Sequence, residues 1–194
     1  WQGVASWQAL YPSDALSTRC ALLMASNAAN RNDQWQKQVA SIWQSESKLA
    51  KPCILAVDAL NTMTPLTAAQ NWQRFDYLLA NDSKEFGELR ERSTGADLAL
   101  LNQYIAFISS AKAPTEAWPN NERTRTVLTI GLQAQAKRDS TQAETLLAQY
   151  AKDYSLSPEQ IIAVQSEIAL WSMVNYQDTA EARYFAVPEK QRSA

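Results

Sequence analysis

The sequence predicts an all-α protein, an irregular α-superhelix of stacked antiparallel helical hairpins. Apolar residues recur every three to four positions along most of the chain, which is the period of a helix with one buried face and not the alternation of a strand. Only four glycines occur in 194 residues, too few for the tight turns of a hairpin-rich β fold. Short polar links separate the periodic segments, and such links force neighbouring helices to run antiparallel.

The first three helices are predicted over residues 13–29, after Asn32-Asp33, and from Pro52 onward. Their apolar stripes are Leu16, Cys20, Leu23 and Met24; Trp35, Val39, Ile42 and Trp43; and Cys53, Ala56, Val57 and Leu60. Thr64-Pro65 then predicts the next helix start, because it offers an N-cap hydroxyl followed by proline at the first helical position. The charge-rich segment KEFGELRERS, residues 84–93, is typical of a solvated helix face with internal ion pairs.

The least helical stretch is KAPTEAWPNN, residues 112–121, which contains two prolines. It predicts a possible hinge within a scaffold region that otherwise spans residues 1–194. Trp118 lies between these prolines, off any helical stripe, and aromatic faces can stack on sugar rings. Trp118 is therefore the one tryptophan that we consider as a ligand contact, whereas Trp35, Trp43, Trp72 and Trp171 fall on stripes and are expected in the core.

Two further helices are predicted after the link KRDST at residues 137–141 and after Ser157-Pro158. The first carries an apolar stripe that ends at Tyr150 and the second one that ends at Trp171. Ser157 and Gln160 form a capping box, because the glutamine amide can reach back to the backbone N–H of the cap residue. Proline at the following position marks the same helix start.

Composition excludes several functions. The net charge is −2, so no basic excess exists to bind nucleic acid phosphates. Histidine is absent, which removes the commonest general base and the commonest zinc ligand, and we predict no cofactor or metal. No apolar run approaches the roughly 20 residues of a membrane span.

The two cysteines, Cys20 and Cys53, are separated by 33 positions. Both lie on apolar stripes, and in an up-down-up stack their helices begin at the same end, so a bridge between them is geometrically reasonable. Two free core thiols are the alternative, because small buried cysteines are common in reduced proteins. The spacing leaves both open.

Two stretches resemble the helical region of the soluble lytic murein transglycosylases, periplasmic enzymes that cleave peptidoglycan. The first contains the N-terminal WQGV, then Cys20, the pair Trp35 and Trp43, and Cys53; the second is residues 138–171. The resemblance implies an α-superhelical array that curls into a ring, and a disulfide between Cys20 and Cys53. It also implies a parent enzyme that cleaves the MurNAc–GlcNAc bond and leaves 1,6-anhydromuramyl ends.

The family's catalytic motifs are missing from this sequence. In the family a Glu-Ser motif and a downstream Gly-Leu-Met-Gln motif belong to a separate lysozyme-like domain. Glu46-Ser47 matches the first dipeptide, but it lies at a polar helix end and no Gly-Leu-Met-Gln follows. We therefore assign no catalytic residue and expect a non-catalytic, periplasmic scaffold whose partners are the glycan strand and the catalytic domain of the parent. The alternative is a helical-repeat adaptor that binds a protein partner.

Overall fold

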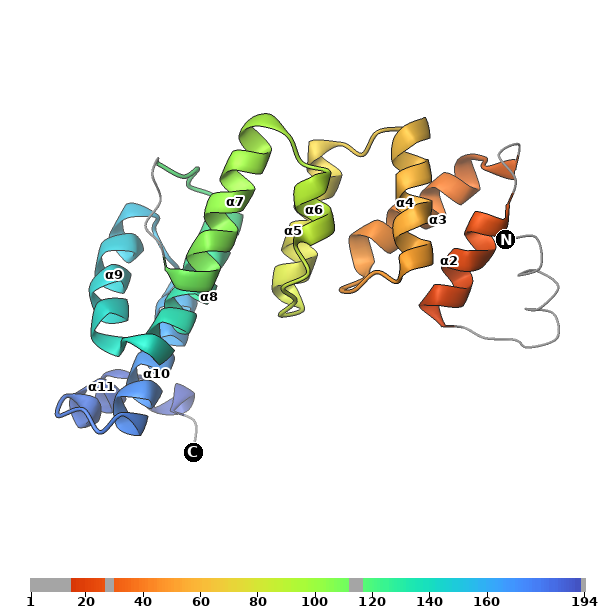
Figure 1. Ribbon diagram of the computed structural model, residues 1–194. Coiled ribbons are helices and arrows are strands. Elements are labelled where there is room, and N and C mark those ends of the chain that lie inside the picture. Colours follow the sequence, from red (N-terminus) through yellow and green to blue (C-terminus); the bar gives the residue numbers. More distant parts are fainter. Residues whose placement is uncertain (1–14, 27–29, 112–116, 193–194) are drawn as a thin grey trace. The chain divides into compact units, whose positions relative to one another are not determined.

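The computed structural model describes residues 15–26, 30–111 and 117–192 (Figure 1). These residues form ten α-helices and no strand, so the all-α prediction is confirmed. The helices belong to two compact units, Trp1–Asp97 and Leu98–Ala194. The boundary between the units falls within a helix and not at residues 112–121, where the sequence predicts a hinge. Residues 112–116 lie outside the described residues, and the hinge stays a prediction.

The first unit is built from helical hairpins. Its helices are α2 (Leu16–Ala25), α3 (Asp33–Ser45), α4 (Lys51–Met63), α5 (Ala68–Ala80) and the short α6 (Gly87–Glu91), followed by the first residues of α7 (Gly95–Ser110). Within the unit, α4 packs on both α2 and α3, and α3 also packs on α5. Stacked hairpins of this kind bury the apolar stripe of each helix against its neighbours.

The second unit is likewise built from packed helices. It contains the rest of α7, then α8 (Glu122–Arg138), α9 (Ser140–Asp153), α10 (Pro158–Val174), α11 (Ala180–Ala186) and a 3₁₀ turn at Glu189–Gln191. Here α10 packs on α8, α9 and α11, and α8 also packs on α9. A single residue, Asp139, ends α8 and caps α9, so the turn between these two helices is very tight.

Of the two predicted capping signals, one locates a helix start correctly and one does not. The capping box of Ser157 and Gln160 is present, with Pro158 at the first helical position. The start predicted at Thr64-Pro65 is wrong: Thr64 ends α4, and the next helix begins after Thr67, which forms a capping box with Gln70. The two threonines offer the same cap chemistry, but only Thr67 has a glutamine three residues later to complete the box.

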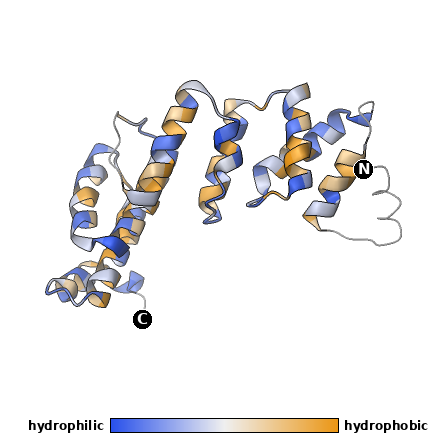
Figure 2. Ribbon diagram, in the orientation of Figure 1, coloured by the Kyte–Doolittle hydropathy of each residue, from blue (hydrophilic) through white to orange (hydrophobic). Residues whose placement is uncertain are grey.

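Each unit has its own apolar core. Hydrophobic and hydrophilic positions share most helices, as one-sided burial requires (Figure 2). The largest fully buried side chains include Trp43, Phe75 and Leu78 in the first unit and Tyr104, Phe107 and Leu128 in the second. None of the helices in the described ranges is long and apolar enough to cross a membrane.

Candidate functional site

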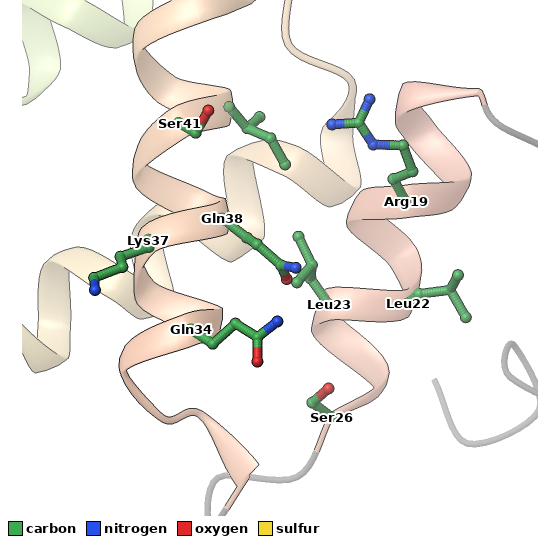
Figure 3. A pocket seen from close by; sticks show the side chains of 9 residues that line it. Arg19, Leu22, Leu23, Ser26, Gln34, Lys37, Gln38 and Ser41 are labelled. Atoms are coloured by element: carbon green, nitrogen blue, oxygen red, sulfur yellow. The ribbon is translucent and has the colours of Figure 1, made fainter.

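An open groove of about 640 Å³ lies between α2 and α3 in the first unit (Figure 3). Nine residues line it: Arg19, Leu22, Leu23, Ser26, Gln34, Lys37, Gln38, Ser41 and Ile42. Its size falls in the range typical of small-ligand sites in proteins. The groove is therefore a candidate binding site of the first unit.

Helical spacing explains why these residues share one surface. The groove residues of α2 and its C-cap Ser26 are spaced i, i+3, i+4 and i+7, and those of α3 follow the same pattern with one further position. Residues at these spacings project from one side of a helix. On α3 this polar stripe adjoins the apolar stripe of Trp35, Val39 and Trp43, which is buried in the core. Ile42 belongs to both stripes, lines the groove and is almost completely buried.

The walls of the groove are held together by two contacts. The Trp35 indole Nε1 donates a hydrogen bond of 2.9 Å to the carbonyl of Leu23, which ties α3 to α2. Cys20 of α2 and Cys53 of α4 are completely buried and pack with Ile42, and Leu23 lies against this cluster. The groove is therefore formed by helices whose separation is set by the core beneath it.

The residues that line the groove include polar and basic side chains but no Asp or Glu. Gln34 and Gln38 extend from α3 into the space between the two helices, while Arg19 lies toward the start of α2 and Ser26 at its end (Figure 3). Lys37 stands at the outer rim, on the far side of α3 from α2. Within the described residues, no hydrogen bond or ion pair uses the side chains of Arg19, Gln34, Lys37 or Gln38. This lining suits a ligand that carries negative charge together with hydroxyl or amide groups.

The cysteines predicted to pair are at disulfide distance. The two Sγ atoms are 2.07 Å apart and the Cα atoms 4.8 Å apart, which joins α2 to α4. The geometry is that of a disulfide. The sequence alone left the bridge and two free thiols open, and the resemblance implied the bridge.

Trp118 is a core residue of the second unit. Only 5% of it is exposed, and its ring packs edge-to-face against Tyr104 and Phe107, with centroids 4.8 and 5.4 Å away. Its indole Nε1 donates to Gln103 Oε1 at 2.9 Å. This burial leaves little of the ring of Trp118, our candidate ligand contact, accessible to a ligand. Trp72 and Trp171, expected in the core, are instead half-buried.

Glu46 has the position expected of a helix end. It is the C-cap residue of α3, and its main-chain carbonyl accepts a hydrogen bond of 3.0 Å from Arg74. It is half-buried, and its sequence neighbours are polar, unlike the apolar pocket that surrounds a catalytic acid. In the described part of the chain, no group of three or more His, Cys, Asp or Glu side chains is arranged to hold a metal ion.

The sequence patterns do not predict the α2–α3 groove. A polar stripe on α3 is readable from the sequence, because Gln34, Lys37, Gln38 and Ser41 follow helical spacing. Such a stripe is ordinarily just the solvated face of a helix, however. Only the packing of α2 beside it turns this face into the wall of a groove.

Comparisons with known proteins relate the chain to others through its fold. No protein-family model matches it, and no curated protein matches it. Among solved structures it is similar to the 70 kDa soluble lytic transglycosylase SLT70 from Escherichia coli, with a TM-score of 0.73 and 14% sequence identity. The match covers 98% of this chain and 32% of the other, so this chain spans about a third of SLT70. At such low identity, the likeness demonstrates a shared helical fold.

Proposed function

We propose that this chain is the helical scaffold region of a periplasmic lytic transglycosylase that acts on peptidoglycan. The observation that carries the proposal is the fold likeness to SLT70 over 98% of the chain. In the proposed parent, this region guides the glycan strand and holds a separate catalytic domain in place. The parent cleaves the MurNAc–GlcNAc bond to leave 1,6-anhydromuramyl products.

The proposal assigns no catalysis to these residues. Glycan cleavage needs a carboxylic acid that stays protonated near the leaving oxygen, and enzymes achieve this by apolar burial. Glu46, the glutamate of the dipeptide that matches the Glu-Ser motif, lies half-buried at the end of α3 beside polar sequence neighbours. The chain also contains no histidine that could serve instead.

The cysteine geometry supports the periplasmic part of the proposal. Disulfides persist in oxidising compartments, the bacterial periplasm among them, and are rare in the reducing cytosol. Cys20 and Cys53 lie at disulfide distance in the core of the first unit.

The test is a muropeptide digest of purified peptidoglycan with three proteins: this chain, its Glu46→Gln variant, and the product of the same gene extended beyond Ala194. We expect anhydromuropeptides from the extended protein only. The extension should encode the Glu-Ser and Gly-Leu-Met-Gln motifs. Products from the short chain that disappear in Glu46→Gln would identify an active site here and refute the scaffold assignment. An extended gene without a catalytic domain would refute the proposed parent.

The alternative function is a helical-repeat adaptor that binds a protein partner. One observation favours it: large apolar side chains are exposed near the end of the second unit. They are Leu170, Met173, Val174, Tyr176 and Phe185, each at least 48% exposed. Met173 and Val174 lie three and four positions after Leu170 on α10, and the three therefore share one face of that helix. An exposed apolar helix face is typical of an interaction site. A gene without a catalytic domain, together with two free thiols in the native protein, would favour this alternative.

A further inference from the structure

We propose that the groove between α2 and α3 binds a saccharide that carries a carboxylate, such as the muramyl peptide units of peptidoglycan. The inference rests on the proposed function for its ligand class, and on the groove itself for the binding chemistry. Arg19 is assigned to the carboxylate, Gln34 and Gln38 to hydroxyl and acetamido groups, and Lys37 to a second, outer anionic group.

The charges in the groove differ from those of the whole protein. The chain has a net charge of −2, yet two of the nine lining residues are cations and none is an acid. Arginine presents a planar fork of N–H donors that matches a carboxylate in two parallel hydrogen bonds. The positive charge of Arg19 is unpaired within the described residues, and so it is available to an incoming anion.

The glutamine side chains and the apolar residues that line the groove suit a sugar ligand. Gln34 and Gln38 each carry both a donor and an acceptor, which fits hydroxyl and acetamido groups that can serve in either role. Leu23 extends into the space between the two helices (Figure 3), and with Ile42 it supplies apolar surface beside the two glutamines, on which the methyl groups and C–H faces of an amino sugar can pack. A purely anionic ligand such as phosphate would leave this apolar surface unused.

The shape of the groove favours a polymer or its fragments. The site is open to solvent, and most of its polar side chains are exposed. A strand can therefore lie along it without having to enter a closed cavity. Exposed charge pairs contribute little each, so the affinity for a short fragment is expected to be weak.

The experiment is an NMR titration of the oxidised full chain with four probes. The first is muramyl dipeptide, which has a sugar and a free glutamyl carboxylate. The others are the same compound with that carboxylate amidated, the N-acetylated dipeptide without the sugar, and N,N′-diacetylchitobiose, which has neither the carboxylate nor the peptide. We expect saturable shifts at groove residues with muramyl dipeptide, and binding at least about threefold weaker with each of the others.

Matched variants locate the site. Arg19→Gln should weaken binding of muramyl dipeptide about three- to fivefold, and Gln38→Glu, which keeps the side-chain shape but adds a negative charge, by at least as much. Lys84→Gln removes an exposed cation of the same unit outside the groove and should leave binding unchanged. Unchanged signals from the core of the first unit would verify that each variant is folded. Equal binding by the three variants, or equal binding of the amidated probe, would overturn the inference.

A sedimentation assay with intact peptidoglycan separates this inference from the proposed function. If wild type and the groove variants sediment equally with peptidoglycan, the groove assignment is wrong while the proposed function stands. If wild type binds muramyl dipeptide through the groove but the extended gene encodes no lytic domain, the groove is right and the proposed function is wrong.

Discussion

The guanidinium carbon of Arg74 lies 4.3 Å from the centre of the Trp43 ring, and both side chains are almost completely buried. One of the Arg74 terminal nitrogens also donates to the main-chain carbonyls of Trp43 and Glu46, at the end of α3. Those carbonyls have no partner within their own helix, as at every helix C-terminus. Arg74 of α5 thus provides hydrogen-bond donors, from within the core, for carbonyl groups at the C-terminal end of α3.

Replacing Arg74 by lysine is expected to destabilise the first unit by about 2 kcal/mol. Burial lowers the pKa of Arg74 to about 10, and the nearby charge of Arg92 lowers it as well. Lysine keeps the charge but loses the planar stacking on Trp43 and the geometry that reaches both carbonyls. Urea denaturation followed by tryptophan fluorescence measures the change. Lys84→Gln is the control and should stay within about 0.5 kcal/mol of wild type; an equal loss in both variants would contradict the role of Arg74.

Reduction or removal of the Cys20–Cys53 bridge is expected to lower the free energy of unfolding by about 3–4 kcal/mol, because the bridge closes a loop of about 34 residues. Thiol titration of the unfolded, unreduced protein should find no free sulfhydryl. Cys20→Ser and Cys53→Ser should unfold at the same urea concentration as the reduced wild type. Two titratable thiols in protein purified under oxidising conditions would rule the bridge out.

The substitution Gly131→Ala in α8 is expected to destabilise the second unit. An added Cβ would collide with the Phe107 ring of α7 and come within 3.1 Å of the Phe107 carbonyl oxygen. Phe107 is fully buried, so its ring has little room to move, and overpacking of this kind costs about 1–3 kcal/mol. Gly87→Ala is the matched control, because a Cβ there meets nothing within 4 Å. Thermal unfolding should separate the two variants; a neutral Gly131→Ala would mean that the two helices can move apart.

We expect Arg183 to hold α11 against α9 and α10. Its side chain is 10% exposed and donates to Glu144 of α9 at 2.7 Å and to Ser172 of α10 at 2.8 Å. Arg183→Ala should lower the free energy of local opening of α11 by about 1–3 kcal/mol. Amide hydrogen exchange measures this helix by helix, and Glu181→Gln, an exposed change on α11, is the control. Uniform loss of protection throughout the second unit would instead indicate that Arg183 supports the whole core.

The sequence by itself determined the helical class, the buried stripes and most helix starts of this protein, because these depend on residues within one or two turns of each other. The stripe of Trp35, Val39, Ile42 and Trp43 is buried as its spacing predicts. The capping box of Ser157 and Gln160 forms where the two residues predict it. In both cases the information is local: a period of 3.6 residues, or a hydroxyl three positions before an amide.

Tertiary structure alone decided which elements meet. The segment KEFGELRERS reads as a solvated helix face, yet only Gly87–Glu91 is helical, and the Arg92 guanidinium turns inward to within 5.3 Å of the Trp43 ring centre. The spacing of Cys20 and Cys53 allowed either a bridge or two thiols until the packing of α2 on α4 brought the sulfurs together. The groove likewise arises from two helices whose polar stripes look like ordinary solvated faces when taken separately. Contacts between distant residues depend on how whole helices pack, and that packing is not encoded in any short stretch of the chain.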